Sequence, residues 1–214
     1  MPIVVFILML VCFAVSLVNY LSKNGPLYLK IFPVFLLLEL VFEYEAFQMA
    51  HRHQNNLFLY NIIMIIEFSF YFFFFYSVYR LSAAKKTVLF LMAGYLAGAL
   101  INIFFIQGMK VFHTYSFMIG CLLVIAGSIY YFLQMFRYPR TGSIMRDPAF
   151  WIASALLFYY ACVLPVYGVL NYISSMSRYF NHTMKFIINF MNILLYSLFT
   201  LAFLCKLSIR KSMS

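Results

Sequence analysis

The chain has 214 residues, of which 66% are hydrophobic and only 9% are charged. Its mean hydropathy of +0.95 excludes a water-soluble fold, because a soluble domain does not tolerate so apolar a surface. The net charge of +10 does not indicate nucleic-acid binding, because its basic residues form no stripe interleaved with stacking aromatics on a soluble face.

Seven apolar runs are each long enough to cross a bilayer, since a spanning helix needs roughly 20 mostly apolar residues. The first run has no basic start and stays apolar through Leu21, so we expect an uncleaved helix rather than a signal peptide. The connections are too short to fold into a soluble domain. We therefore predict a single all-α domain over residues 1–214, a seven-transmembrane-helix bundle. Its helices are expected at 2–22, 29–50, 57–79, 87–107, 115–136, 149–172 and 184–205.

The basic residues predict the orientation of this bundle. Eleven of the 15 fall on one side of it, namely Lys23, Lys30, Arg80, Lys85, Lys86, Arg137, Arg140, Arg146, Lys206, Arg210 and Lys211. By the positive-inside rule that side is cytoplasmic, with the N-terminus outside and the C-terminus inside, in a bacterial inner (cytoplasmic) membrane. The same residues are expected to contact anionic membrane lipids.

The second run, 29–50, contains three of the five acidic residues of the chain. Glu39 lies near its middle, and Glu43 shares the same face one turn further out. Glu45 is turned about 200° from Glu43 and lies nearer the outer interface. Glu45 is therefore interpreted as an interfacial residue. A carboxylate inside a membrane usually faces the protein interior or a wet cavity, so Glu39 and Glu43 are the first candidates for a functional site.

The third run, 57–79, descends from the outer side and brings Glu67 close to the level of Glu39. We expect Glu39, Glu43, Asn61 and Glu67 to converge between these two helices. Other polar candidates on neighbouring helices are Asn102, Asn189, Asn192 and Tyr196. The other aromatic residues, which make up 21% of the chain, are assigned to packing and to the membrane interfaces, with no cofactor role.

Glu39, Glu43 and Glu67 have no intramembrane Lys or Arg, so they cannot all be ionised cheaply. One interpretation is a proton- or cation-responsive polar cavity. The other is that protonated glutamates and asparagines form interhelical hydrogen bonds, each worth about 0.6 to 2 kcal/mol. The sequence does not decide between the two.

The four histidines, His51, His53, His113 and His182, fall together on the predicted outer side. They could begin a metal site or a pH sensor, but we favour interfacial histidines with access to water and expect no metal site. No cofactor is expected either, and the absence of HExxH, GxSxG and P-loop motifs leaves no catalytic residue to name.

Two local patterns concern helix packing and helix ends. Gly94 and Gly98 form a GxxxG motif, which lets two helix backbones approach closely. We favour a contact inside the bundle, with a homodimer contact as the alternative. Ser143 and the Asp147-Pro148 pair are candidates for the N-cap and first turn of the sixth helix.

Three segments resemble a family of uncharacterised bacterial seven-helix integral membrane proteins. They are Asn102-Ile-Phe-Phe-Ile-Gln-Gly, Asp147-Pro-Ala-Phe-Trp and Asn192-Ile-Leu-Leu-Tyr-Ser-Leu-Phe. The resemblance implies the architecture and transfers no catalytic residue. The chain is also loosely similar to the membrane modules of bacterial sensor histidine kinases, at the level of architecture only.

For function, the sequence favours a membrane sensor or accessory protein. Its polar cavity would respond to a small ligand, proton or cation and act through a separate cytoplasmic partner, because the chain carries no output domain of its own. The alternative is a small proton- or cation-coupled transporter or channel, with the glutamates as coupling site. A membrane-embedded enzyme ranks third, because no nucleophile or metal cluster accompanies the glutamates.

Overall fold

The computed structural model describes residues 3–20, 25–138, 143–168 and 178–211. All of the regular secondary structure in these residues is helical, and they contain no strand. The seven long helices are α1 (Ile3–Tyr20), α2 (Leu27–His51), α3 (Leu57–Val78), α4 (Ser82–Ile101), α5 (Thr114–Arg137), α6 (Pro148–Gly168) and α7 (Arg178–Lys211). A π-helical turn, η1 (Asn102–Ile106), follows α4, and a short 3-10 turn, η2 (Ile144–Arg146), precedes α6.

Each predicted run lies on one of these helices, although the ends differ. The α4 helix begins before its apolar run, and α7 extends beyond its run at both ends, because these helices include flanking basic residues such as Lys85 and Arg178 that a hydropathy criterion leaves out. The predicted ends at residues 2, 21–22 and 169–172 lie outside the described residues, as do Lys23 and Arg140.

Five of the helices are long and apolar enough to cross a membrane. They are α3, α4 together with η1, α5, α6 and residues His182–Cys205 of α7, with mean hydropathies of 1.9 to 2.2. The apolar part of α1, Ile3–Val18, is shorter. The α2 helix is not in this group because it contains Lys30 and three glutamates. The chain is thus an all-helical bundle with the character of a membrane protein.

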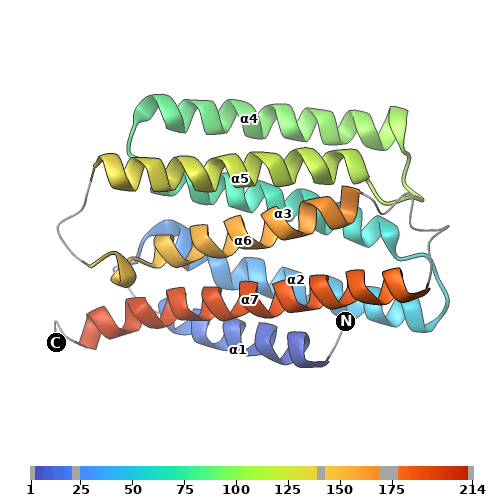
Figure 1. The fold of residues 1–214 in the computed structure, drawn as a ribbon, viewed down its shortest axis with the longest axis horizontal. Coiled ribbons are helices and arrows are strands. Elements are labelled where there is room, and N and C mark those ends of the chain that lie inside the picture. The colour runs from blue at the N-terminus through green and yellow to red at the C-terminus, as the bar shows by residue number, and fades with distance from the viewer. Residues whose placement is uncertain (1–2, 21–24, 139–142, 169–177, 212–214) are drawn as a thin grey trace.

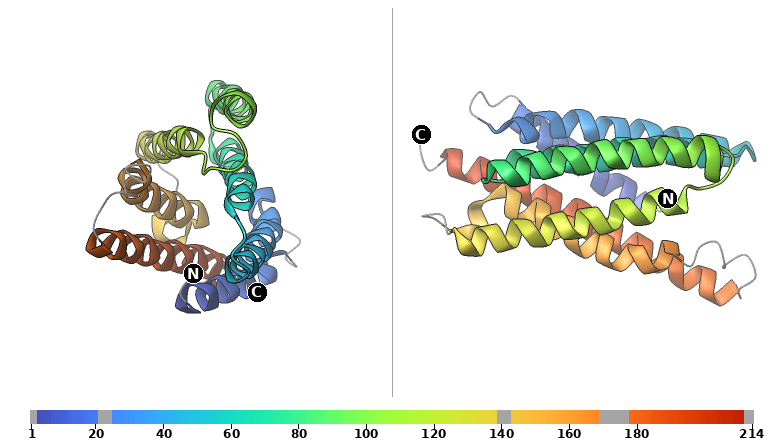
Figure 2. Two further views of the ribbon diagram at one scale, coloured as in Figure 1. Left: turned by 90° about the vertical axis from the view of Figure 1, so that its right-hand side faces the viewer. Right: turned by 90° about the horizontal axis from the view of Figure 1, so that it is seen from above.

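Six of the helices form a closed ring. Each helix contacts the next in the order α1, α2, α3, α5, α6, α7, and α7 in turn contacts α1. The remaining helix, α4, packs outside this ring against α3 and α5, as the end-on view shows (Figure 2). The helices run up and down, so the connections fall at two opposite ends (Figure 1).

We name these ends by their residues. The histidine end contains His51, His53, His113 and His182. The basic end contains Arg80, Lys85, Arg137 and Arg146.

Phenylalanine side chains fill the interior of the ring toward the basic end. Phe32 of α2 lies at their centre, with ring centroids 4.9 Å from Phe70, 5.0 Å from Phe199 and 5.1 Å from Phe203. Phe35 stacks on Phe70 at 4.2 Å. These residues are buried, so α2, α3 and α7 meet in a packed aromatic core in this half of the bundle.

The expected internal contact at the GxxxG motif is wrong. Gly94 and Gly98 are exposed on α4, and a Cβ atom added at either would meet nothing within 4 Å. The reason is the position of α4 outside the ring, which leaves this face without a neighbouring helix. The alternative, a homodimer contact through Gly94 and Gly98, stays a prediction.

The close helix contact is made instead by two glycines of α5. A Cβ atom at Gly120 would lie 2.5 Å from Cε2 of Phe68, and one at Gly127 would lie 2.8 Å from Cε2 of Phe75. The two glycines are seven residues apart, as are the two phenylalanines, so two aromatic rings of α3 pack against two glycines on one face of α5. This contact fixes α3 against α5.

The start of α6 follows the predicted cap at Asp147. Its Oδ1 atom accepts a hydrogen bond from the backbone N–H of Ala149 at 3.0 Å, and Pro148 occupies the first helical position. Ser143 precedes η2 and makes no side-chain cap, so of the two candidates only Asp147 caps the helix.

Candidate functional site

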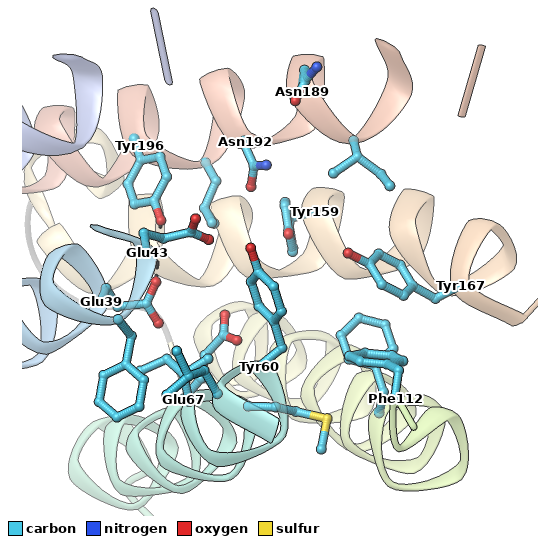
Figure 3. Close-up of a pocket in the computed structure, with 17 residues that line it drawn as sticks. Glu39, Glu43, Tyr60, Glu67, Phe112, Tyr159, Tyr167, Asn189, Asn192 and Tyr196 are labelled. Carbon is cyan, nitrogen blue, oxygen red and sulfur yellow. Dashed lines mark hydrogen bonds between the residues drawn. The ribbon is translucent and has the colours of Figure 1, made fainter. Parts of the chain in front are cut away.

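A cavity of about 250 Å³ lies inside the ring in the half nearer the histidine end. Side chains from α2, α3, α5, α6 and α7, together with Phe112 just before α5, form its wall (Figure 3). Its polar lining consists of Glu39, Glu43, Tyr60, Glu67, Tyr159, Tyr167, Asn189, Asn192 and Tyr196. At roughly 30 Å³ per molecule the space is equivalent to about eight waters.

The charge of this lining is entirely acidic. Three glutamates contribute carboxyl groups, and no Lys, Arg or His is among the described residues that line the cavity. The carboxyl groups of Glu39, Glu43 and Glu67 face the same space (Figure 3). Six of the eight residues named from the sequence therefore meet here, from helices that are far apart in the chain.

Glu67 is the glutamate with the most hydrogen bonds. Its Oε1 atom accepts one from the Tyr71 hydroxyl at 2.9 Å and one from the Tyr160 hydroxyl at 2.7 Å. Tyr71 lies one turn further along α3, whereas Tyr160 belongs to α6, and both tyrosines are buried. Glu67 thereby links α3 to α6 at the wall of the cavity.

Glu39 and Glu43 have fewer partners. The Tyr196 hydroxyl donates to Oε2 of Glu39 at 3.3 Å, while the buried Oε1 atom of Glu39 has no hydrogen-bond partner in the described part of the chain. Glu43 lines the cavity and accepts no hydrogen bond from the described residues. Glu45, two residues on, is exposed on another face of α2, as its position on the helix predicts.

Aromatic rings enclose the side of the cavity nearer the histidine end. The rings of Phe112, Phe117 and Tyr167 pack against one another, with centroid separations of 5.6, 5.4 and 4.5 Å. Tyr60 and Tyr159 complete this wall, and Figure 3 shows their hydroxyl groups directed into the cavity. The cavity thus combines carboxyl groups with aromatic rings.

Two of the residues named from the sequence lie outside the cavity. The side-chain amide of Asn61 donates to the carbonyl of Val111 at 2.8 Å and accepts from the backbone N–H of His113 at 3.0 Å. Asn102, at the start of η1, donates to Gln107 and to Ser116, each at 2.8 Å. Both asparagines therefore bind the α4–α5 connection.

The histidines do not share one environment. His51, His53 and His182 are exposed, as expected for interfacial residues. His113 is 1% exposed, and its Nε2 atom lies 2.8 Å from the carbonyl oxygen of Gly108, so the prediction of water access is wrong for this residue. His113 is buried because the α4–α5 connection folds over α3. No three His, Cys, Asp or Glu side chains among the described residues are grouped so as to hold a metal ion.

Sequence reasoning missed the tyrosines of the site. Tyr60, Tyr71, Tyr159, Tyr160 and Tyr167 were assigned to packing and interfaces with the other aromatics. A usable signal existed for three of them. Tyr71 follows Glu67 by one helical turn, and the Tyr159-Tyr160 pair places phenol groups in the middle of an apolar helix, where a hydroxyl needs a partner.

Comparison with known proteins gives no match. No protein-family model matches the chain, and no curated protein or solved structure is significantly similar to it. The resemblance to bacterial seven-helix membrane proteins and to sensor-kinase membrane modules therefore stays a prediction.

Proposed function

We propose that the chain is an integral membrane sensor or accessory protein that binds a small ligand, proton or cation in the acidic cavity and acts through a separate cytoplasmic partner. In this proposal all seven helices span a bacterial inner membrane. The histidine end faces outward and the basic end faces the cytoplasm, where its positive charge contacts anionic lipids and the partner.

The observation that carries this proposal is the one-sided position of the cavity. It lies in the half of the bundle nearer the histidine end, whereas the other half of the ring interior is filled by Phe32, Phe70, Phe199 and Phe203. A site confined to one half of the bundle, next to a packed core in the other half, suits a receptor that binds a solute and responds to it. A channel needs a continuous path instead.

The α2 and α7 helices provide a physical route for the response. Glu39 and Tyr196 belong to the cavity, and Phe32 and Phe199 on the same two helices are in contact in the aromatic core. A change in charge or occupancy between α2 and α7 therefore acts on two helices that continue to the basic end. A sensor also requires that α2 and α7 have two alternative arrangements that bind the ligand with different affinities.

The single tryptophan of the chain offers a test of this transmission. Trp151 lies in the first turn of α6 at the basic end, where its Nε1 atom donates to the carbonyl of Met145 at 2.9 Å. We expect Trp151 fluorescence of the protein in lipid nanodiscs to change as the pH is varied. The change should be lost in Glu39→Gln and Glu43→Gln, which cannot ionise there, and kept in the exposed control Glu45→Gln. Equal pH responses in all three variants would contradict the proposal.

The second candidate is a proton- or cation-coupled transporter or channel. The same acidic cavity favours it, since intramembrane carboxylates often form coupling sites. Reconstituted liposomes separate the two candidates. A sensor gives no flux of protons or monovalent cations above that of protein-free vesicles, whereas a flux abolished by Glu43→Gln would assign the cavity to transport.

A further inference from the structure

The composition of the cavity wall narrows the class of ligand beyond the proposed function. We propose that the cavity binds a small organic cation, an ammonium group that carries apolar substituents. The inference rests on the proposal that the cavity is a ligand site, and it names the chemistry that the site recognises.

Charge is the first argument. The cavity presents three carboxyl groups and no basic side chain among its described lining. Glu43 accepts no hydrogen bond from the described residues, and the Oε1 atom of Glu39 is buried without a partner. A buried acceptor without a donor is costly, and a cationic donor beside Glu39 and Glu43 would compensate their negative charge and supply the hydrogen bond that Glu39 lacks. An anionic ligand would add to the repulsion.

Aromatic faces are the second argument. A positive charge is attracted to the face of a Tyr or Phe ring, and cages of such rings bind substituted ammonium groups. The cavity has this wall in Tyr60, Phe112, Phe117, Tyr159 and Tyr167. Apolar substituents of the ligand would contact the same rings. A proton or a metal ion has no such substituents, so it would not make use of an aromatic wall.

The lining and the size of the cavity do not suit a metal ion as its main occupant. Hard cations such as Ca²⁺ take about six to eight oxygen ligands at close range. The described part of the chain brings no three carboxylate, histidine or cysteine side chains into such a group. The cavity of about 250 Å³ is also far larger than one ion requires, and it approaches the lower end of the size range of small-molecule sites.

Calorimetric titration of the purified protein in nanodiscs tests the inference. The probe is tetramethylammonium chloride, compared with its neutral isostere tert-butanol and with the chlorides of sodium and calcium. We expect the organic cation to bind more tightly than the other three. Glu43→Gln should weaken its binding by about tenfold or more, as the loss of one charged contact predicts, and Glu45→Gln should leave it unchanged.

A second pair of variants probes the aromatic wall. Tyr167→Leu removes a ring face and should weaken binding of tetramethylammonium by about fivefold, while Tyr167→Phe keeps the face and should bind as the parent protein does. These variants keep the test decisive if Glu43→Gln fails to fold, which its gel-filtration profile would show.

Three results would overturn the inference: equal binding of tert-butanol, preferential binding of calcium, or equal losses in the Glu43 and Glu45 variants. The Trp151 experiment separates this outcome from failure of the proposed function. A pH response of Trp151 without binding of tetramethylammonium rejects only the ligand class. Binding without any Trp151 response rejects the sensor and leaves the ligand class in place.

Discussion

Three glutamates at a similar depth in the bundle have three different environments. Glu67 accepts hydrogen bonds from two tyrosine hydroxyls and Glu39 accepts one from a third tyrosine, while Glu43 accepts no hydrogen bond from the described residues. The difference follows from their neighbours, since Tyr71 and Tyr160 reach Glu67 from α3 and α6. Glu67 therefore contributes mainly to the link between two helices, while Glu43 is the most available for a ligand.

This difference predicts that the same substitution lowers stability at Glu67 but not at Glu43. Glu67→Leu leaves the hydroxyls of Tyr71 and Tyr160 without their acceptor and should lower the free energy of unfolding by about 2 kcal/mol. Glu43→Leu removes no hydrogen bond to a described residue and should not lower it. Thermal unfolding of both variants in the same detergent measures the difference. Equal transition temperatures would show that the tyrosine hydrogen bonds do not stabilise the bundle.

At the scale of elements, helix contacts are decided by where small residues meet large ones. The GxxxG motif of α4 has no partner among the described residues, whereas Gly120 and Gly127 of α5 pack against Phe68 and Phe75 of α3. A glycine motif thus permits a close approach of two helices, but the approach occurs only where a neighbouring helix packs against that face.

Matched glycine substitutions test this assignment. Gly120→Ala places a methyl group against the Phe68 ring and should destabilise the protein by about 1 to 3 kcal/mol through overpacking. Gly94→Ala meets open space and should leave stability unchanged or raise it slightly, because alanine is the better helix former. Unfolding midpoints of the two variants provide the comparison. A loss in Gly94→Ala as large as that in Gly120→Ala would contradict the position of α4 outside the ring.

For the whole molecule, the interior of the bundle changes in character along one axis. The acidic cavity lies toward the histidine end, the aromatic core lies toward the basic end, and positively charged residues flank that core. The basic residues thus lie at the end of the bundle opposite the cavity, and the orientation of the bundle in the membrane stays a prediction.

Labelling of intact cells tests this orientation. In a background without the four native cysteines, single cysteines are introduced at His53 and Met145, which are exposed at opposite ends. We expect a membrane-impermeant maleimide to label His53→Cys in intact cells and Met145→Cys only after permeabilisation, because the positive-inside rule predicts that the basic end is cytoplasmic. Labelling of both from the outside would overturn the predicted topology.

The sequence by itself determined the helices and the membrane character of the chain, because both depend on long apolar runs that are local in sequence. It also identified Glu39 and Glu43 as neighbours on one face, since residues four apart meet on a helix.

Only the tertiary structure decided which polar groups share the cavity. Asn61 and Glu67 belong to the same helix, but at 100° per residue they point about 120° apart, so one binds the α4–α5 connection and the other faces the cavity. Tyr159, Tyr167 and Tyr196 join the site from α6 and α7 because the ring closes there. That closure depends on the order of neighbouring helices, which the local pattern of a sequence does not specify.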